Sequence, residues 1–198
     1  MLKAAFIVGA LTALAPLTAQ AQAWQYRCPA PGTVVERSDG SRVAYRGTDP
    51  SDPLVCLTTT GQRLVFGNWN AGSPIYRSGK ADLARLINAA AAGQTGGQVQ
   101  VHYFTPGRDH NSVHVLETWR IGGMGPVTTM AGTFDAVRLE RNFAIIGSTY
   151  IYDQQVWIDR ATGAPVKAVV THLNMVMAPD LVTWEAAAVQ APSVQSSR

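Results

Sequence analysis

Residue types that carry recognisable chemistry are scarce in this chain. It has only two cysteines, and they do not form a C-x-x-C motif, so thiol redox catalysis and a cysteine-based metal site have no support. Charge is also scarce, because 16 Lys and Arg residues stand against 13 Asp and Glu residues and the basic residues form no run or stripe. This weak, dispersed charge argues against nucleic acid as a partner.

Motifs of common enzymes are missing as well. The sequence contains no H-E-x-x-H and no G-x-S-x-G, and the glycines of GQTGGQ lack the Lys-Ser/Thr pair of a phosphate-binding loop. Asp109, His110 and Ser112 lie close together in one loop, whereas a catalytic triad converges from distant segments. We interpret these three residues as loop-capping groups and expect no enzyme activity.

The histidines and acids add little chemistry. Four scattered histidines predict no metal site, although His102 and His114 would face each other if their strands form a hairpin. Asp49, Asp52 and Glu140 have no spacing that would pair two carboxylates for glycoside hydrolysis, so we interpret them as solvated acids. The GTDPSDP segment lacks the glutamate that a calcium loop needs. We therefore expect neither a metal nor a cofactor.

Residues 1–23 are typical of a cleavable signal peptide. Lys3 precedes an apolar run of about 11 residues, shorter than the roughly 20 residues of a membrane-spanning helix. Ala21-Gln22-Ala23 has the small-x-small spacing of a cleavage site, so we place the cut after Ala23. No cysteine stands at the cut, which predicts no lipid anchor, and no later stretch is long and apolar enough for a transmembrane segment. We expect a soluble, periplasmic or secreted protein.

Cys28 and Cys56 predict a disulfide, because an exported chain enters an oxidising compartment. The segment between them, TVVERSDGSRVAYRG, predicts a β-hairpin around Asp39-Gly40, the dipeptide of a two-residue turn in which both central residues need positive φ. Residues 24–72 are therefore expected to form a disulfide-stapled hairpin module, followed by a larger domain at 73–190.

One helix is expected, in the segment SGKADLARLINAAAAG. From Leu83 onward its apolar residues recur at i, i+3, i+4 and i+7, Ser78 or Asp82 can begin the helix, and Gly93 can end it. The preceding residues, 68–79, are interpreted as a loop because glycine and proline interrupt them.

Antiparallel strands are expected over most of the remaining chain. The predicted strands cover residues 62–67, 99–104, 112–121, a segment that follows Gly132, 151–158 and 164–171, with a bent strand or strand pair in 173–190. IGGMGP is expected to interrupt the strand pattern after residue 121. Asp159 to Gly163 are expected to form a turn in which Gly163 has positive φ. Residues 191–198 are expected to be disordered.

Alternation in AGTFDAVRLER predicts a strand with one dry face and one wet face. Val137 and Leu139 alternate there with Arg138 and Glu140. The overall fold class is thus mainly β (α+β), a curved antiparallel sheet or half-barrel with one main α-helix.

The C-terminal half resembles the LolA/LolB/RseB-like family of periplasmic half-barrels. In that family a strand ending W-x-D turns through T-G-x-P into the next strand, and the matching residues here are Trp157, Asp159, Thr162, Gly163 and Pro165, with Gly132-Thr133-Phe134 upstream. The resemblance implies a strongly curved sheet partly wrapped around a helix, sometimes with an apolar concave face that holds lipid or lipoprotein acyl chains.

Aromatic and methionine side chains are the candidate ligand contacts, because they suit the wall of an apolar groove. They are Phe134, Tyr150, Tyr152, Trp157, Met175 and Met177. We therefore expect a non-enzymatic periplasmic protein that binds an apolar or amphipathic cell-envelope ligand, such as a lipid, on its curved sheet. The alternative is an envelope-assembly module that docks a protein partner through a sheet edge.

Overall fold

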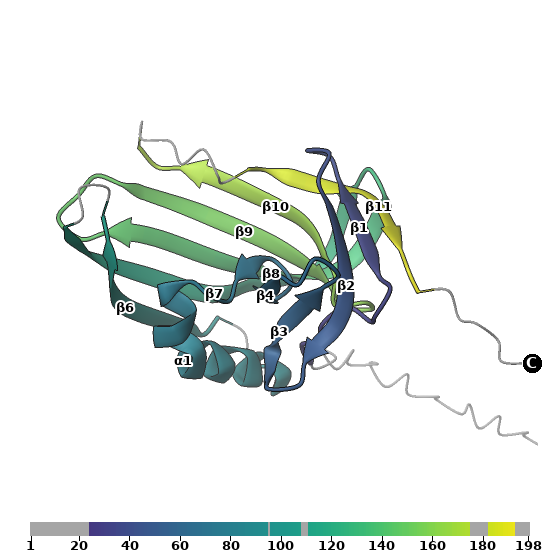
Figure 1. The fold of residues 1–198 in the computed structure, drawn as a ribbon, viewed down its shortest axis with the longest axis horizontal. Coiled ribbons are helices and arrows are strands. Elements are labelled where there is room, and N and C mark those ends of the chain that lie inside the picture. Colours follow the sequence, from purple (N-terminus) through teal and green to yellow (C-terminus); the bar gives the residue numbers. More distant parts are fainter. Residues whose placement is uncertain (1–23, 95, 108–110, 175–181, 193–198) are drawn as a thin grey trace, which may run out of the picture.

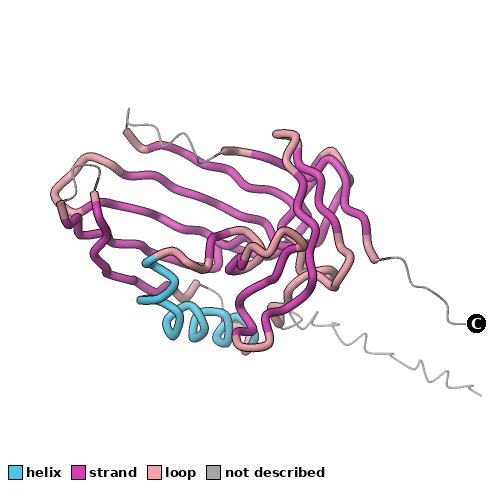
Figure 2. The backbone as a smooth tube through the Cα atoms, viewed as in Figure 1, coloured by secondary structure: helices cyan, strands magenta, loops and turns pink. Residues whose placement is uncertain are grey.

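Strands dominate the architecture, as Figure 2 shows, and they form one antiparallel, open, curved sheet. The structure is a computed structural model that describes residues 24–94, 96–107, 111–174 and 182–192. Within those residues there are 11 strands and one helix, which confirms the predicted fold class. The predicted signal peptide lies outside the described residues, as do residues 193–198 of the predicted disordered tail.

The sheet has the strand order β5-β4-β3-β2-β1-β11-β10-β9-β8-β7-β6. In chain order the elements are β1 Val34–Arg37, β2 Arg42–Asp49, β3 Asp52–Thr58, β4 Arg63–Val65, β5 Trp69–Asn70, α1 Pro74–Ala91, β6 Gln98–Pro106, β7 Ser112–Thr129, β8 Gly132–Ile145, β9 Ile151–Asp159, β10 Pro165–His172 and β11 Trp184–Gln190. β1 pairs with β11, so the N-terminal hairpin continues the sheet of the C-terminal part. A domain boundary at residue 72 stays a prediction.

The N-terminal hairpin forms as predicted, but its turn differs. Of the turn residues only Gly40 has positive φ, at 82°, and the Arg37 N–H donates to the Ser41 carbonyl, so the loop has three residues. The Asp39 carboxylate accepts hydrogen bonds from the Ser41 N–H and hydroxyl. A three-residue loop needs positive φ only at its last position, which is Gly40, so Asp39 keeps a negative φ and its side chain caps the turn.

The predicted disulfide is present. Cys28 precedes β1 and is bonded to Cys56 of β3, with 5.4 Å between their Cα atoms. β3 was missed in the sequence, although it lies next to β2 in the sheet. The disulfide therefore ties the segment before the first strand to a buried strand of the sheet.

Helix α1 begins earlier than predicted. Pro74 occupies its first turn and Ser73 its N-cap, so residues assigned to a loop are helical. Proline suits this place because the first N–H groups of a helix have no partner within it. The predicted apolar face is confirmed, since Leu83, Leu86, Ile87 and Ala90 are all buried, and Gly93 follows the helix with φ at 78°.

Strand β7 is longer than predicted, because the IGGMGP segment continues the strand instead of ending it. The register with β8 shifts between Ile121 and Gly123, which is a β-bulge, and pairing resumes as far as Thr129. Bulges absorb extra residues and increase strand twist. The long β7–β8 pair runs across the molecule beside β9 and β10, with α1 lying along β6 in Figure 1.

The turn between β9 and β10 forms as predicted, with Gly163 at a φ of 74°. Asp159 accepts hydrogen bonds from the Thr162 N–H and hydroxyl, and Pro165 begins the returning strand. A β-carbon on Gly163 would lie 2.0 Å from the Arg27 carbonyl oxygen. This turn is therefore in close contact with the segment that precedes Cys28.

Gly163→Ala should destabilise the fold more than a matched change at Gly40. Both residues have positive φ, but only Gly163 has a neighbour within reach of a new β-carbon. We expect Gly40→Ala to lower the free energy of unfolding by about 1 kcal/mol and Gly163→Ala by about 3 kcal/mol or more. Urea denaturation measures both, and equal losses would contradict the close approach to Arg27.

Candidate functional site

The two faces of the sheet differ in chemistry because successive side chains of a strand point to opposite faces. We call the face on which α1 packs the inner face, since a β-carbon on Gly79 of α1 would lie 2.6 Å from the Val101 side chain of β6. The register places Val101, Glu117, Trp119, Arg141, Phe143, Tyr152 and Gln154 on the inner face, and Gln100, Thr118, Asn142 and Asp153 on the outer face.

A buried ion pair occupies the inner face. Arg141 donates to both carboxylate oxygens of Glu117, with Nε 2.6 Å from Oε2 and Nη2 2.6 Å from Oε1. The Tyr103 hydroxyl donates to Oε1 over 2.8 Å, and the Trp119 indole N–H donates to Oε2 over 3.0 Å. Glu117 is fully buried, so its charge depends entirely on these four hydrogen bonds.

This environment fixes the protonation of the surrounding groups. Burial lowers the pKa of Arg141, but the charge and hydrogen bonds of Glu117, together with smaller contributions from Tyr152 and Tyr103, outweigh burial and leave that pKa above its ordinary value. Burial, reinforced by the Glu117 charge, raises the pKa of Tyr103 far above its usual range. Burial also raises the pKa of Tyr152 to about 12, although Arg141 opposes this shift. At neutral pH the arginine is charged and both phenols remain hydrogen-bond donors.

The β4–β5 hairpin is anchored to this cluster. The Trp69 indole N–H donates to Oε1 of Gln154 over 2.7 Å, and Arg141 Nη1 lies 3.4 Å from the same oxygen. Phe66, in the hairpin turn, has a φ of 50°, the only positive φ of a non-glycine residue among those described. Its ring packs edge-on against Tyr26 and Trp69, with centroids 5.2 and 6.2 Å apart. Aromatic packing thus offsets the strained backbone of the turn.

A cavity of about 200 Å³ lies between this hairpin, α1 and the inner face. Its wall is mainly apolar, and Arg141 contributes the charged group of the wall. The lining residues are Val65, Trp69, Asn70, Ser73, Ile75, Tyr76, Leu83, Trp119 and Arg141.

An aromatic cluster lies next to Arg141 on the inner face. Phe143 and Tyr152 stack with centroids 4.8 Å apart, and Tyr150 packs edge-on against both. The Arg141 guanidinium carbon is 5.6 Å from the Phe143 centroid, 5.7 Å from that of Tyr152 and 5.6 Å from that of Trp119. Arg141 therefore connects the cavity wall to the aromatic cluster.

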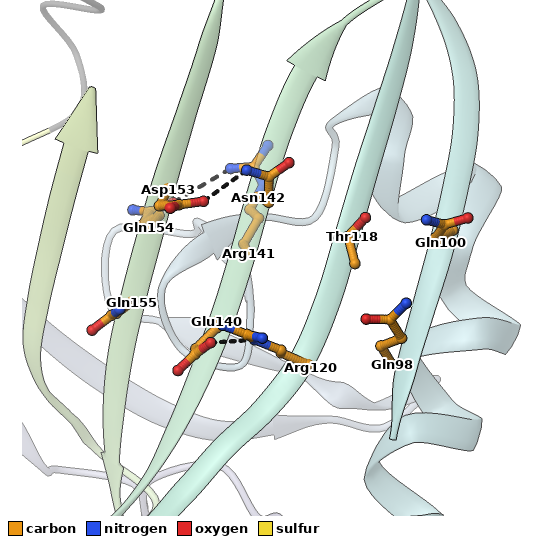
Figure 3. A pocket seen from close by; sticks show the side chains of 10 residues that line it. All are labelled: Gln98, Gln100, Thr118, Arg120, Glu140, Arg141, Asn142, Asp153, Gln154 and Gln155. Carbon is orange, nitrogen blue, oxygen red and sulfur yellow. Dashed lines mark hydrogen bonds and ion pairs between the residues drawn. The ribbon is translucent and has the colours of Figure 1, made fainter. Parts of the chain in front are cut away.

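The outer face carries a polar hollow of about 370 Å³, shown in Figure 3. Asn142 donates to Asp153 over 2.7 Å, and Glu140 is paired with Arg120 and with Arg138, the latter over 2.7 Å. The other lining residues are Gln98, Gln100, Thr118, Arg141, Gln154 and Gln155. Amides and paired charges make this face suited to water rather than to an apolar ligand.

The predicted ligand-lining residues do not share one face. Tyr150 and Tyr152 meet on the inner face. Trp157 lies five positions after Tyr152 on β9 and is paired with Arg138, which places it on the outer face. Phe134 lies four positions before Arg138 on β8 and shares that face by the same alternation. Met175 and Met177 lie outside the described residues.

The three carboxylates interpreted as solvated acids are buried, so that interpretation is wrong. Asp52 accepts hydrogen bonds from the Tyr76 hydroxyl and the Lys80 ammonium, both over 2.7 Å. Asp49 is paired with Arg63 over 2.7 Å, and Glu140 with two arginines. A buried carboxylate needs such partners, and the partners come from segments that sequence spacing does not relate.

His102 and His114 face each other, as predicted, with 3.3 Å between Nδ1 of His102 and Nε2 of His114. No group of three or more His, Cys, Asp or Glu side chains close enough to hold a metal ion occurs among the described residues. Asp109 and His110, considered for loop capping with Ser112, lie outside those residues.

Sequence reasoning missed the Glu117–Arg141 pair. A signal was present in the alternation, because Glu117 stands between the apolar residues Val115 and Trp119 on its face, and Arg141 between Leu139 and Phe143. One charge in each of two neighbouring apolar faces indicates a buried pair, but only the register of β7 and β8 brings the two charges together.

Comparison with known proteins gives a distant similarity of fold. Neither a protein-family model nor a curated protein matches the sequence. Among solved structures, the hypothetical lipoprotein YmcC from Escherichia coli (K12) matches with a TM-score of 0.44 and 14% sequence identity over 88% of this chain and 91% of that chain. The half-barrel family resemblance therefore stays a prediction.

No helix among the described residues is long and apolar enough to cross a membrane. The disulfide between Cys28 and Cys56 fits a location outside the cytoplasm.

Glu117→Ala should destabilise the protein more than the removal of an exposed acid does. It leaves the Arg141 charge buried without a partner, so we expect the free energy of unfolding to fall by about 3–5 kcal/mol. The control is Glu36→Ala, because Glu36 is 46% exposed and 3.9 Å from Arg42, and its loss should cost less than about 1 kcal/mol. Urea denaturation measures both; similar losses would show that the buried pair is dispensable.

Tyr152 should make stability depend on alkaline pH. The folded protein holds the phenol proton more tightly than the unfolded chain, in which tyrosine titrates near pH 10. Stability from Tyr152 is therefore complete below about pH 10 and is lost as pH rises towards 12. We expect Tyr152→Phe to lose less stability than the parent protein between about pH 10 and about pH 12 in urea titrations. Equal losses would contradict the raised pKa.

Proposed function

We propose that the protein binds an apolar or amphipathic component of the cell envelope on the inner face of its sheet, and that it catalyses no reaction. The observation that carries the proposal is the apolar cavity enclosed by α1, the β4–β5 hairpin and the sheet. Ligand sites are typically concave and mainly apolar, with few polar groups that fix orientation. The predicted signal peptide and the disulfide support a role in the periplasm or outside the cell.

The size of the cavity supports partial enclosure of the ligand. At about 200 Å³ it is smaller than the roughly 300–1,000 Å³ of a typical small-molecule site. In this proposal the cavity holds one end of an acyl chain. The rest of the ligand lies along the aromatic cluster of Phe143, Tyr150 and Tyr152. Aromatic rings provide apolar contact area, and tyrosine hydroxyls provide hydrogen bonds at its rim.

Arg141 suits the boundary between these two parts of the site. Its Nε and Nη2 are committed to Glu117, whereas the hydrogen bond of Nη1 among the described residues is a long one, 3.4 Å from Gln154. A ligand oxygen at this point would find a donor beside apolar walls. The arrangement supports an amphipathic ligand over a purely apolar one.

A protein-docking role through a sheet edge is the second candidate. β6 is an end strand of nine residues, and Phe104 on it is 67% exposed. A free edge strand can pair with an extended segment of another chain. Ligand binding and protein docking differ in what remains bound after purification. A ligand-binding protein retains a small molecule on its inner face, whereas a protein that docks a partner through its sheet edge does not.

Ser73→Phe should block the proposed ligand site. Ser73 lines the cavity and makes no side-chain hydrogen bond as the N-cap of α1, so a larger side chain fills space without removing a cap. We expect the affinity for the apolar fluorophore N-phenyl-1-naphthylamine to fall about tenfold, equivalent to about 1.4 kcal/mol. Fluorescence titration of the purified protein measures the affinity.

Thr118→Phe is the matched control, because Thr118 lines the hollow on the outer face. It should leave the affinity for the fluorophore unchanged. Native mass spectra of protein purified from the periplasm without detergent supply a second measurement, in which a lipid-sized mass should be lost on denaturation. Absence of both fluorophore binding and retained lipid would overturn the proposal.

A further inference from the structure

Two histidines meet on the outer face, on the side of the sheet away from the proposed ligand site. The register pairs His102 with Leu116 and Phe104 with His114, so the two histidines are diagonal neighbours on adjacent strands. Diagonal neighbours are within reach of long side chains. Their ring centroids are 5.4 Å apart, and their nearest nitrogens 3.3 Å apart.

The separation of these nitrogens matches that of two ligands on one zinc ion. Nitrogens about 2.0–2.1 Å from a tetrahedral Zn²⁺ are about 3.3–3.4 Å from each other. The two nitrogens form a hydrogen bond with each other, and the exposed His102 ring can turn so that its lone pair and that of the half-buried His114 are directed at one ion. Imidazole is a preferred ligand of zinc and of its neighbours in the first transition series.

Phe104 restricts the orientation of one of the two rings. Its ring stacks on that of His114, with centroids 4.8 Å apart and planes at 19°. The backbone on both sides is held by continuous pairing from Gln98 to Pro106. The two imidazoles are therefore held close together before any ion binds, and this lowers the entropic cost of chelation.

We propose that His102 and His114 chelate a zinc ion on the outer face of the β6–β7 hairpin. Two imidazoles supply two coordination positions, and water fills the remaining positions. Zinc sites with four protein ligands are structural, whereas this site keeps open positions and exchanges its ion with solution. The site is independent of the proposed ligand site, because the strands place the two on opposite faces of the sheet.

Zinc titration of the purified protein by calorimetry, in a buffer that does not bind zinc, tests the site. We expect one zinc ion per chain in the parent protein. His102→Ala and His114→Ala should each weaken binding on the order of 100-fold, because the second imidazole acts as an intramolecular ligand. In histidine NMR spectra, zinc should shift the ring signals of both residues together.

Gln100→Ala is the control, since Gln100 lies two positions before His102 on the same face of β6, and it should leave zinc affinity unchanged. Calcium should not compete, because it prefers oxygen ligands. Loss of affinity in only one of the two histidine variants would overturn chelation by the pair. Unchanged binding in both variants, or no binding by the parent protein, would overturn the site altogether.

Discussion

A buried carboxylate on β7 constrains much of the sheet around it. Glu117 has no exposure to solvent, so every one of its hydrogen bonds must come from the protein. The donors belong to β6, β7 and β8, and Gln154 of β9 joins the same network through Arg141. A slip of one residue between β7 and β8 would move one charge to the outer face and leave the other buried alone, which makes the observed register strongly preferred.

The same cluster explains how distant parts of the chain enclose one cavity. Trp69, in the short strand before α1, reaches Gln154 of β9, and Phe66 accepts a strained backbone conformation to pack its ring in the core. The disulfide ties Cys28 to β3, next to these strands in the sheet. Residues between Val65 and Leu83 thereby form one wall of the cavity, and Trp119 and Arg141 on the long strands form the other.

The two faces of the sheet offer different chemistry because of alternation alone. Apolar and aromatic side chains gather on the inner face, with one neutralised ion pair among them, whereas amides, paired charges and two histidines lie on the outer face. The proposed apolar ligand and the proposed zinc ion would therefore occupy opposite faces of the same strands. Trp157 illustrates the alternation of side chains along a strand. It lies five positions after Tyr152 on β9, which is an odd number, so its side chain is on the opposite face.

Local signals in the sequence determined the elements that depend on neighbouring residues. We could predict the helix from the apolar spacing that starts at Leu83, and the turns from Gly40 and Gly163, because both depend on neighbouring residues. The Cys28–Cys56 disulfide could be predicted because the chain has two cysteines and is expected to enter an oxidising compartment. The start of the helix was predicted too late in the sequence, because proline is as typical of a loop as of the first turn of a helix, where Pro74 lies. A continuous β7 was missed because a bulge can absorb glycines that otherwise end a strand.

Only the tertiary structure decided which charges are buried and which side chains meet. Asp52, Glu117 and Glu140 read as solvated or unremarkable acids in the sequence, and each is buried against cations brought to it by strand pairing or by α1. The His102–His114 pair could be anticipated because one hairpin joins its strands. The Glu117–Arg141 pair and the cavity beside it could not, because both depend on strand register and on contacts between segments far apart in the chain.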